Sequence, residues 1–224
     1  MNRWNKAMGY LRRGQIGKLF VQTFRSLPGI LNSLIAKRRD KRFGGIPANR
    51  TLPSRFRELG ANGTQSSDYR CLKRVFRAVP LRRDEVFLDV GCGEGRVLTY
   101  LYSRGFRGKA IGIELDPEVA KVAAARTAAC ENISICCGNV LNQRELLEQV
   151  TVIYLFNPFS RSVLHDFVAL AESACKGSVR LYYLCDLYAS ELESSGRWRC
   201  LHSDVIRRPN CNPMRFSVYE LTAG

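Results

Sequence analysis

Short apolar runs alternate with amphipathic segments from residue 86 onward. The apolar runs have the length of strands and cover 86–90, 110–115, 133–137, 150–156 and 179–187. Segments with the apolar spacing of helices lie between these runs, at 96–103, 117–130, 143–149 and 160–176. Strands that are apolar along their whole length are typical of a parallel sheet covered by helices on both faces. The pattern therefore predicts an α/β fold with a doubly wound, mainly parallel sheet.

The last part of the chain has a different pattern. Two strand-like runs, 197–206 and 214–221, are joined by a stretch rich in turn residues that includes Pro209, Asn210 and Pro213. Consecutive strands with a short, turn-rich connection pair antiparallel. We therefore expect a C-terminal antiparallel hairpin that closes the sheet.

The first 60 residues look like an extension of this domain. Apolar residues such as Leu19, Phe20 and Phe24 fall at helical spacing, and a second such set follows Pro28. Residues 43–68 are rich in Gly, Asn, Ser, Thr and Pro, which is typical of a linker or loop. A helix that ends near Pro80 comes next. We divide the chain into a basic helical arm with linker, residues 1–60, and a main domain, residues 61–224.

The charge of the chain is concentrated in the arm. The whole chain has a net charge of +15, and residues 1–60 hold 14 Lys or Arg and two acidic residues, a net +12. A basic amphipathic arm is attracted to polyanions, so an anionic membrane surface and a nucleic acid are both candidate partners. Packing of the apolar stripe on the main domain, with the basic face solvated, is a third interpretation. The pattern does not decide among them.

Cysteine usage and hydropathy bear on location. The nine cysteines include no C-x-x-C pair, and residues 1–14 are polar and basic with no apolar signal core. No apolar run approaches the 18 or so residues that a transmembrane helix needs. We expect free thiols, no metal site and a cytoplasmic protein, with peripheral membrane contact through the arm as one option.

The candidate chemistry lies just after the first strand, in Asp89-Val90-Gly91-Cys92-Gly93-Glu94-Gly95. A glycine loop between a strand and a helix lets the backbone approach a ligand closely. The dinucleotide pattern G-x-G-x-x-G would need glycine at 96, where the chain has Arg96. A carboxylate at Asp89 would oppose a pyrophosphate and suit a cationic ligand.

This loop resembles motif I of the class I S-adenosylmethionine-dependent methyltransferases, and three later strand ends resemble further motifs of that family. The resemblance covers about residues 85–187 and implies a seven-stranded sheet and S-adenosylmethionine as cofactor. It implies that Asp89 and the loop hold the methionine part, that Glu114 accepts the ribose hydroxyls and that Asn139 binds the adenine. The family usually has an acid where this chain has Asn139. The site residues expected for the cofactor are Asp89, Gly91, Gly93, Gly95, Glu114 and Asn139.

The fourth strand is followed by Asn157-Pro158-Phe159, which is similar to the acceptor motif of methyltransferases that act on amino groups. The resemblance implies that Asn157 is catalytic and that Asn157, Pro158 and Phe159 line the substrate site. The chain departs from that motif by having a single proline. A neutral nitrogen acceptor needs no strong general base, and both histidines, His165 and His202, lie away from the predicted site.

We therefore predict methyl transfer to an unidentified acceptor, with an amino or amide nitrogen of a small molecule or protein as the first candidate. An RNA or DNA methyltransferase that grips its substrate with the basic arm is an alternative. A scaffold that binds the cofactor without catalysis is another. The oligomeric state is not indicated by the sequence.

Overall fold

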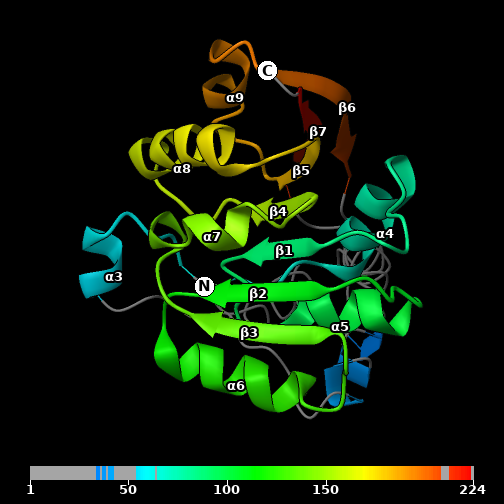
Figure 1. Cartoon of the computed structure of the whole chain (residues 1–224). Helices are drawn as coiled ribbons and strands as arrows, with labels where there is room; N and C mark the ends of the chain where they lie inside the picture. The colour runs from blue at the N-terminus through cyan, green and yellow to red at the C-terminus, as the bar shows by residue number, and fades with distance from the viewer. Residues whose placement is uncertain are drawn as a thin grey trace, which may run out of the picture.

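The structure is a computed structural model of the whole chain, shown in Figure 1. It describes residues 34, 35, 37, 38, 40–42, 54–63, 65–207 and 212–222. Most of the predicted basic arm, and with it the expected partners of that arm, lies outside the described residues. Within the described part, none of the helices has the length and apolar character needed to cross a bilayer.

A seven-stranded sheet forms the centre of the molecule (Figure 1). Its strands are β1 (Phe87–Val90), β2 (Ala110–Glu114), β3 (Ile133–Cys137), β4 (Val152–Phe156), β5 (Val179–Leu184), β6 (Trp198–Ile206) and β7 (Met214–Leu221). They lie in the order β3-β2-β1-β4-β5-β7-β6. β1 to β5 are parallel, and β7 pairs antiparallel with both β5 and β6. The predicted mainly parallel sheet with a C-terminal antiparallel hairpin is confirmed.

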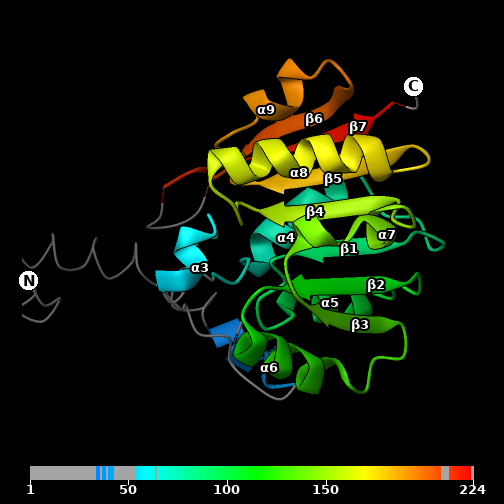
Figure 2. The same cartoon turned by 60° about the vertical axis from the view of Figure 1, so that its left-hand side comes forward.

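Helices cover both faces of the sheet (Figure 2). They are α3 (Ser54–Glu58), α4 (Tyr69–Ala78), α5 (Arg96–Ser103), α6 (Pro117–Thr127), α7 (Arg144–Leu147), α8 (Arg161–Ala174) and α9 (Ser190–Ser194), with a short 3-10 helix η1 (Val140–Asn142). The apolar residues of α4 and α5 pack on one face, and those of α7, α8 and α9 pack on the other. Burial on both faces explains why the parallel strands are apolar at almost every position.

The sheet order places a ligand-binding edge at the carboxyl ends of β1 and β4. From β1 the chain moves outward through β2 and β3, and it then returns to add β4 on the other side of β1. The loops after β1 and β4 therefore leave the sheet in opposite directions. In open α/β sheets such a reversal creates the crevice in which ligands bind.

The predicted helices and strands from residue 86 onward are present, although several bounds differ, such as β5, which ends at Leu184 and not at 187, and η1 was not predicted. The helix at 96–103 and the strands at 133–137 and 214–221 have the predicted bounds. The segment 43–68, predicted as a linker or loop, contains the short helix α3, and the tail contains the unpredicted helix α9. Both helices have five residues, which is too short for an apolar period to appear in the sequence.

Candidate functional site

The glycine loop after β1 has a backbone that suits glycine. Gly91, Gly93 and Gly95 all have positive φ, at 71°, 55° and 79°. Residues with a Cβ rarely adopt this left-handed conformation. A Cβ on Gly91 would also lie 3.1 Å from Cβ of Pro158, so this glycine allows the loops after β1 and β4 to approach each other.

Glu114, the last residue of β2, is joined to the glycine loop by a hydrogen bond. Its Oε2 accepts from the Gly93 N–H at 2.8 Å and its Oε1 accepts from the Asp116 N–H at 3.0 Å. Burial raises the pKa of Glu114, and these backbone donors oppose that rise. Each carboxylate oxygen has a second lone pair, so the side chain can still accept from two hydroxyl groups of a ligand.

Asp89 is a buried acid without a complete set of partners. It is 2% exposed, and among the described residues no hydrogen-bond donor reaches its Oδ2. Burial, together with the nearby charge of Glu114, raises the pKa of Asp89 to about 8. A buried carboxylate oxygen without a donor is costly. A cationic ligand in the cavity would remove this cost.

Asn139 follows β3 and caps the 3-10 helix η1. Its Oδ1 accepts from the Leu141 N–H at 3.0 Å. The predicted bond from an adenine amino group would use the remaining lone pair of that oxygen, so the role of Asn139 stays a prediction.

The loop after β4 is held by Asn62, a residue of the segment that precedes α4. The Nδ2 of Asn62 donates to the backbone oxygens of Asn157 and Phe159, both at 2.8 Å. Its backbone N–H donates to the oxygen of Pro158 at 2.9 Å. One asparagine thus occupies three consecutive carbonyl groups of the predicted acceptor motif.

The side chain of Asn157 is placed differently from the sequence expectation. Its Oδ1 accepts from the Tyr183 hydroxyl at 3.4 Å, and Asn157 is not one of the residues that line the cavity. Its backbone has a φ of 43°, a left-handed conformation that asparagine tolerates. The sequence-based role of Asn157 as a catalytic residue stays a prediction.

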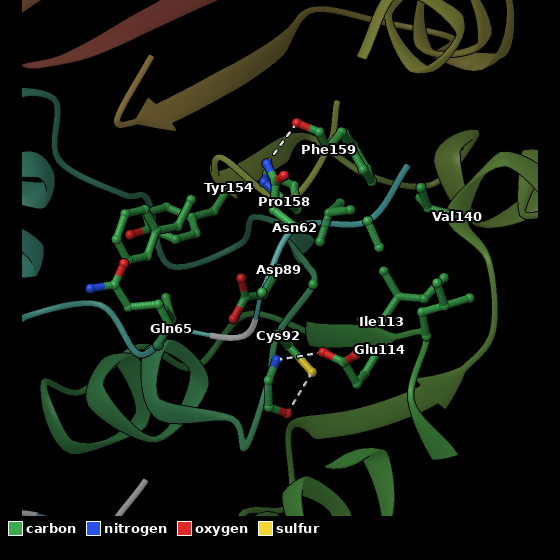
Figure 3. Close-up of a pocket in the computed structure, with 18 of the residues that line it drawn as sticks. Asn62, Gln65, Asp89, Cys92, Ile113, Glu114, Val140, Tyr154, Pro158 and Phe159 are labelled. Atoms are coloured by element: carbon green, nitrogen blue, oxygen red, sulfur yellow. Dashed lines mark hydrogen bonds between the residues drawn. The ribbon is translucent and has the colours of Figure 1, made fainter. Parts of the chain in front are cut away.

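These elements enclose one cavity at the carboxyl edge of the sheet (Figure 3). It holds about 940 Å³ of space, a value that includes open solvent at its mouth. Asp89 points into its centre, with Glu114 on one side and Tyr154 on the other (Figure 3). The predicted residues that line it are Asp89, Gly91, Gly93, Glu114, Asn139, Pro158 and Phe159. Gly95 and Asn157 lie outside its lining.

Polar residues of the segment before α4 line the cavity together with Tyr154 of β4. The hydroxyl groups of Ser67 and Tyr154 lie 2.9 Å apart, and Gln65 and Ser67 also line the cavity. For Gln65, Ser67 and Tyr69, the sequence leaves open whether they cover the cofactor or belong to a plain polar linker. The structure places the first two in the lining and directs the Tyr69 hydroxyl to Asp40, at 2.7 Å.

Three residues of the site were not identified from the sequence. Asn62 lies in a stretch with turn composition, Tyr154 occupies an ordinary position inside an apolar strand, and Arg96 is the first residue of α5. None of the three forms a local pattern. Only the pairing of segments 95 to 97 residues apart gives Asn62 its role, because its partners are Asn157, Pro158 and Phe159.

Sequence comparison matches part of the chain to known methyltransferases. Residues 87–176 match the family model described as a methyltransferase domain. A curated protein of Mycobacterium tuberculosis, named as a methyltransferase, is 41% identical over 50 residues, which are 22% of this chain and 30% of that protein. The match therefore spans less than a third of the length of this relative.

Solved structures share the fold at low sequence identity. An RNA methyltransferase of Salinibacter ruber in complex with S-adenosyl-L-homocysteine has a TM-score of 0.56 and 16% identity, over 71% of this chain and 95% of that chain. The N-methyltransferase NodS of Bradyrhizobium japonicum has a TM-score of 0.57 and 11% identity, over 69% and 96%. A Streptococcus pneumoniae protein described as a tRNA methyltransferase, in complex with S-adenosyl-L-methionine, has a TM-score of 0.54 and 18% identity, over 68% and 72%.

The sheet order, the glycine loop after β1 and the family match all lead to the same assignment. Residues 87–176 match a methyltransferase domain, and the described residues have the fold of solved methyltransferases that bind S-adenosyl-L-homocysteine or S-adenosyl-L-methionine.

Proposed function

We propose that the protein transfers a methyl group from S-adenosylmethionine to a nitrogen atom that carries an available lone pair. The observation that carries the proposal is Asp89, a buried carboxylate with one unpartnered oxygen in a cavity built on the glycine loop. Its electrostatics favour a cation, and the cofactor carries an ammonium group and a sulfonium group.

The residues of the cavity suit the parts of the cofactor. Asp89 would receive the ammonium group beside the glycine loop. Glu114 would accept the ribose hydroxyls with the lone pairs that Gly93 and Asp116 leave free. Asn139 and the buried Val140 would border the adenine, because both line the cavity after β3.

The chain itself contributes position and shielding to the reaction. Bound S-adenosylmethionine supplies a methyl group on a positively charged sulfur, and an in-line attack by the acceptor forms the N–C bond as the C–S bond breaks. Holding the two reactants in line can lower the barrier by ~7–11 kcal/mol. Pro158 and Phe159 border the acceptor side, and Asn62 fixes the loop that carries them.

The lining favours a nitrogen acceptor over one that must first lose a proton. The described residues that line the cavity include no histidine or lysine. Their acids, Asp89 and Glu114, lie at the end assigned to the cofactor. A neutral amine or a ring nitrogen of a base reacts through its own lone pair and needs no base to activate it.

Calorimetric titration with S-adenosylmethionine tests the cofactor site. The intact protein should bind it, and Glu114→Gln should weaken binding at least tenfold, which is a loss of about 1.4 kcal/mol. Asp84→Asn, which changes an exposed acid at the far end of β1, serves as the control and should bind normally. Equal affinity of all three proteins would overturn the assignment of Glu114.

Methyl transfer itself is tested with cofactor labelled in the methyl group. Fractions of RNA, protein and small molecules are incubated with the enzyme, and the labelled product is hydrolysed to locate the methyl group. A label on nitrogen supports the proposal. A label on carbon or oxygen contradicts it, and a protein that binds the cofactor but labels no fraction would be a binding scaffold.

A further inference from the structure

Helix α4 presents a row of cations to solvent. Arg70, Lys73, Arg74 and Arg77 are spaced i, i+3, i+4 and i+7 and therefore lie on one face of the helix. All four are exposed, and no acidic residue occurs within α4. We call these four residues the α4 stripe.

The α4 stripe begins at the edge of the candidate active site. Ser67 lines the cavity, Asp68 caps the helix by accepting from the Arg70 N–H at 2.7 Å, and Arg70 is the first cation of the row. With a rise of 1.5 Å per residue, the row from Arg70 to Arg77 is about 10 Å long. The row therefore leads away from the site along the surface of the domain.

Most of the charge of the α4 stripe is not neutralised. Arg74 donates to Asp204 of β6 at 2.6 and 2.9 Å, and this bond holds the pKa of Asp204 below its usual range. Within the described residues, Arg70, Lys73 and Arg77 have no acidic partner. The four cations and His202 of β6 line a shallow hollow between α4 and the edge of the sheet.

The composition of this face favours phosphate groups over a lipid surface. A helix that lies on a membrane combines its cations with exposed large apolar residues. Among the exposed large apolar residues of the described chain, only Val205 of β6 is close in sequence to a residue that contacts the α4 stripe; the others are Leu34, Ile35, Leu59, Val122 and Leu187. Three of the four cations are arginines, whose planar guanidinium groups match phosphate oxygens in pairs.

We infer that the α4 stripe binds the phosphate backbone of an RNA acceptor whose target base enters the adjacent cavity. This inference rests on the proposed function, since it names the molecule that carries the acceptor nitrogen. A base can reach a buried methyl donor only when it is out of the stack, and the loops and single strands of RNA present such bases.

The experiment measures binding of a labelled, mixed-sequence 20-nucleotide single-stranded RNA to the full chain by fluorescence anisotropy at several salt concentrations. The test variant is Arg70→Glu/Lys73→Glu/Arg77→Glu. The control is Arg104→Glu/Lys109→Glu/Lys121→Glu, which changes three exposed cations away from α4 and gives the same net charge. Both variants keep the N-terminal arm.

The test variant should bind RNA at least tenfold more weakly than the control. The slope of log affinity against log salt should fall by about two, because about 0.7 counterions are released per phosphate neutralised on a single strand. Equal losses in the two triple variants would show a general effect of net charge and overturn the inference. Tighter or equal binding of DNA of the same sequence would overturn the assignment to RNA.

Two further measurements separate the remaining explanations. In the first, vesicles of phosphatidylserine and phosphatidylcholine replace the RNA as probe. If the test variant loses vesicle binding but keeps RNA binding, the α4 stripe is a lipid-binding face, and this result contradicts the inference. Calorimetry with S-adenosylmethionine should give the same affinity for both triple variants. Failure of the intact protein to bind the cofactor would contradict the proposed function. Failure of the intact protein to bind RNA, with cofactor binding retained, would contradict only the inference about the α4 stripe.

Discussion

Asp40 forms a two-point ion pair with Arg96, the residue that directly follows the glycine loop. Its carboxylate lies 2.7 Å from Nη2 and 3.2 Å from Nε of Arg96, and it also accepts from the Tyr69 hydroxyl at 2.7 Å. Asp40 is 1% exposed although its chain neighbours Lys41 and Arg42 are exposed. Since Arg96 lines the cavity, one acid of the predicted basic arm reaches the wall of the candidate site.

Replacing Asp40 should destabilise the domain. Asp40→Ala leaves the guanidinium of Arg96 and the hydroxyl of Tyr69 without their buried partner, and breaking a buried ion pair in this way costs about 3 kcal/mol. Urea unfolding measures the change. Glu58→Ala, which removes the other acid of residues 1–60 at an exposed position, is the control and should stay within about 0.5 kcal/mol of the parent. A stable Asp40→Ala protein would show that the contact contributes nothing to folding.

The sequence predicts the domain well because its main signals are local. The strand at 133–137 and the helix at 96–103 follow from apolar period and length, and the Ser160 cap of α8 follows from residue type. In the segment 1–60 the sequence does not predict the burial of Asp40, because a buried aspartate among basic residues is indistinguishable in the sequence from a solvated one. Burial of Asp40 depends on Tyr69, Arg96 and Arg126, which are far along the chain.

In the candidate site, too, the sequence predicts some features and not others. The positions of Asp89, Glu114 and Asn139 follow from strand ends, because the topology of the sheet brings successive strand ends to one edge. The orientation of Asn157 does not follow, since it depends on the hydroxyl of Tyr183 in the neighbouring strand. A pattern of residue types gives the edge of the sheet at which a side chain lies, and the contacts made across strands decide where it points.

Cofactor binding should release a proton near neutral pH. The pKa of Asp89 in the empty cavity is about 8, so the carboxyl group is mostly protonated at pH 7, whereas a bound ammonium group favours the carboxylate. The affinity for S-adenosylmethionine should therefore rise between pH 6 and pH 7.5. Calorimetry at pH 7 in two buffers with different ionisation enthalpies should report about one proton released. Asp89→Asn should abolish the release, and an unchanged proton count in that variant would show that another group titrates.

Asp89 should reduce the stability of the cofactor-free protein. Because burial raises the pKa of Asp89 above its value of 3.8 in the unfolded chain, the folded state binds more protons between about pH 4 and pH 8, and stability falls as the pH rises through this window. At pH 8, Asp89→Asn should stabilise the empty protein by about 5 kcal/mol, or roughly 10–20 °C in a thermal melt. At pH 4 the gain should vanish. A gain that does not change with pH would place its origin outside the titration of Asp89.

Asn62 should matter more for methyl transfer than for cofactor binding, because its contacts are to the acceptor loop. Asn62→Ala removes both donors to the carbonyl oxygens of Asn157 and Phe159 and leaves these partly buried groups unpaired, while the residues that contact the cofactor side of the cavity are unchanged. We expect the rate of methyl transfer to fall at least tenfold and the affinity for S-adenosylmethionine to change less than threefold. Asn62→Asp has nearly the same shape but sets a carboxylate against two carbonyl groups, and it should be at least as slow.

If both variants transfer methyl groups at the parental rate, the loop does not need Asn62 to hold the acceptor in line. If both lose the cofactor instead, Asn62 belongs to the cofactor site and not to the acceptor side.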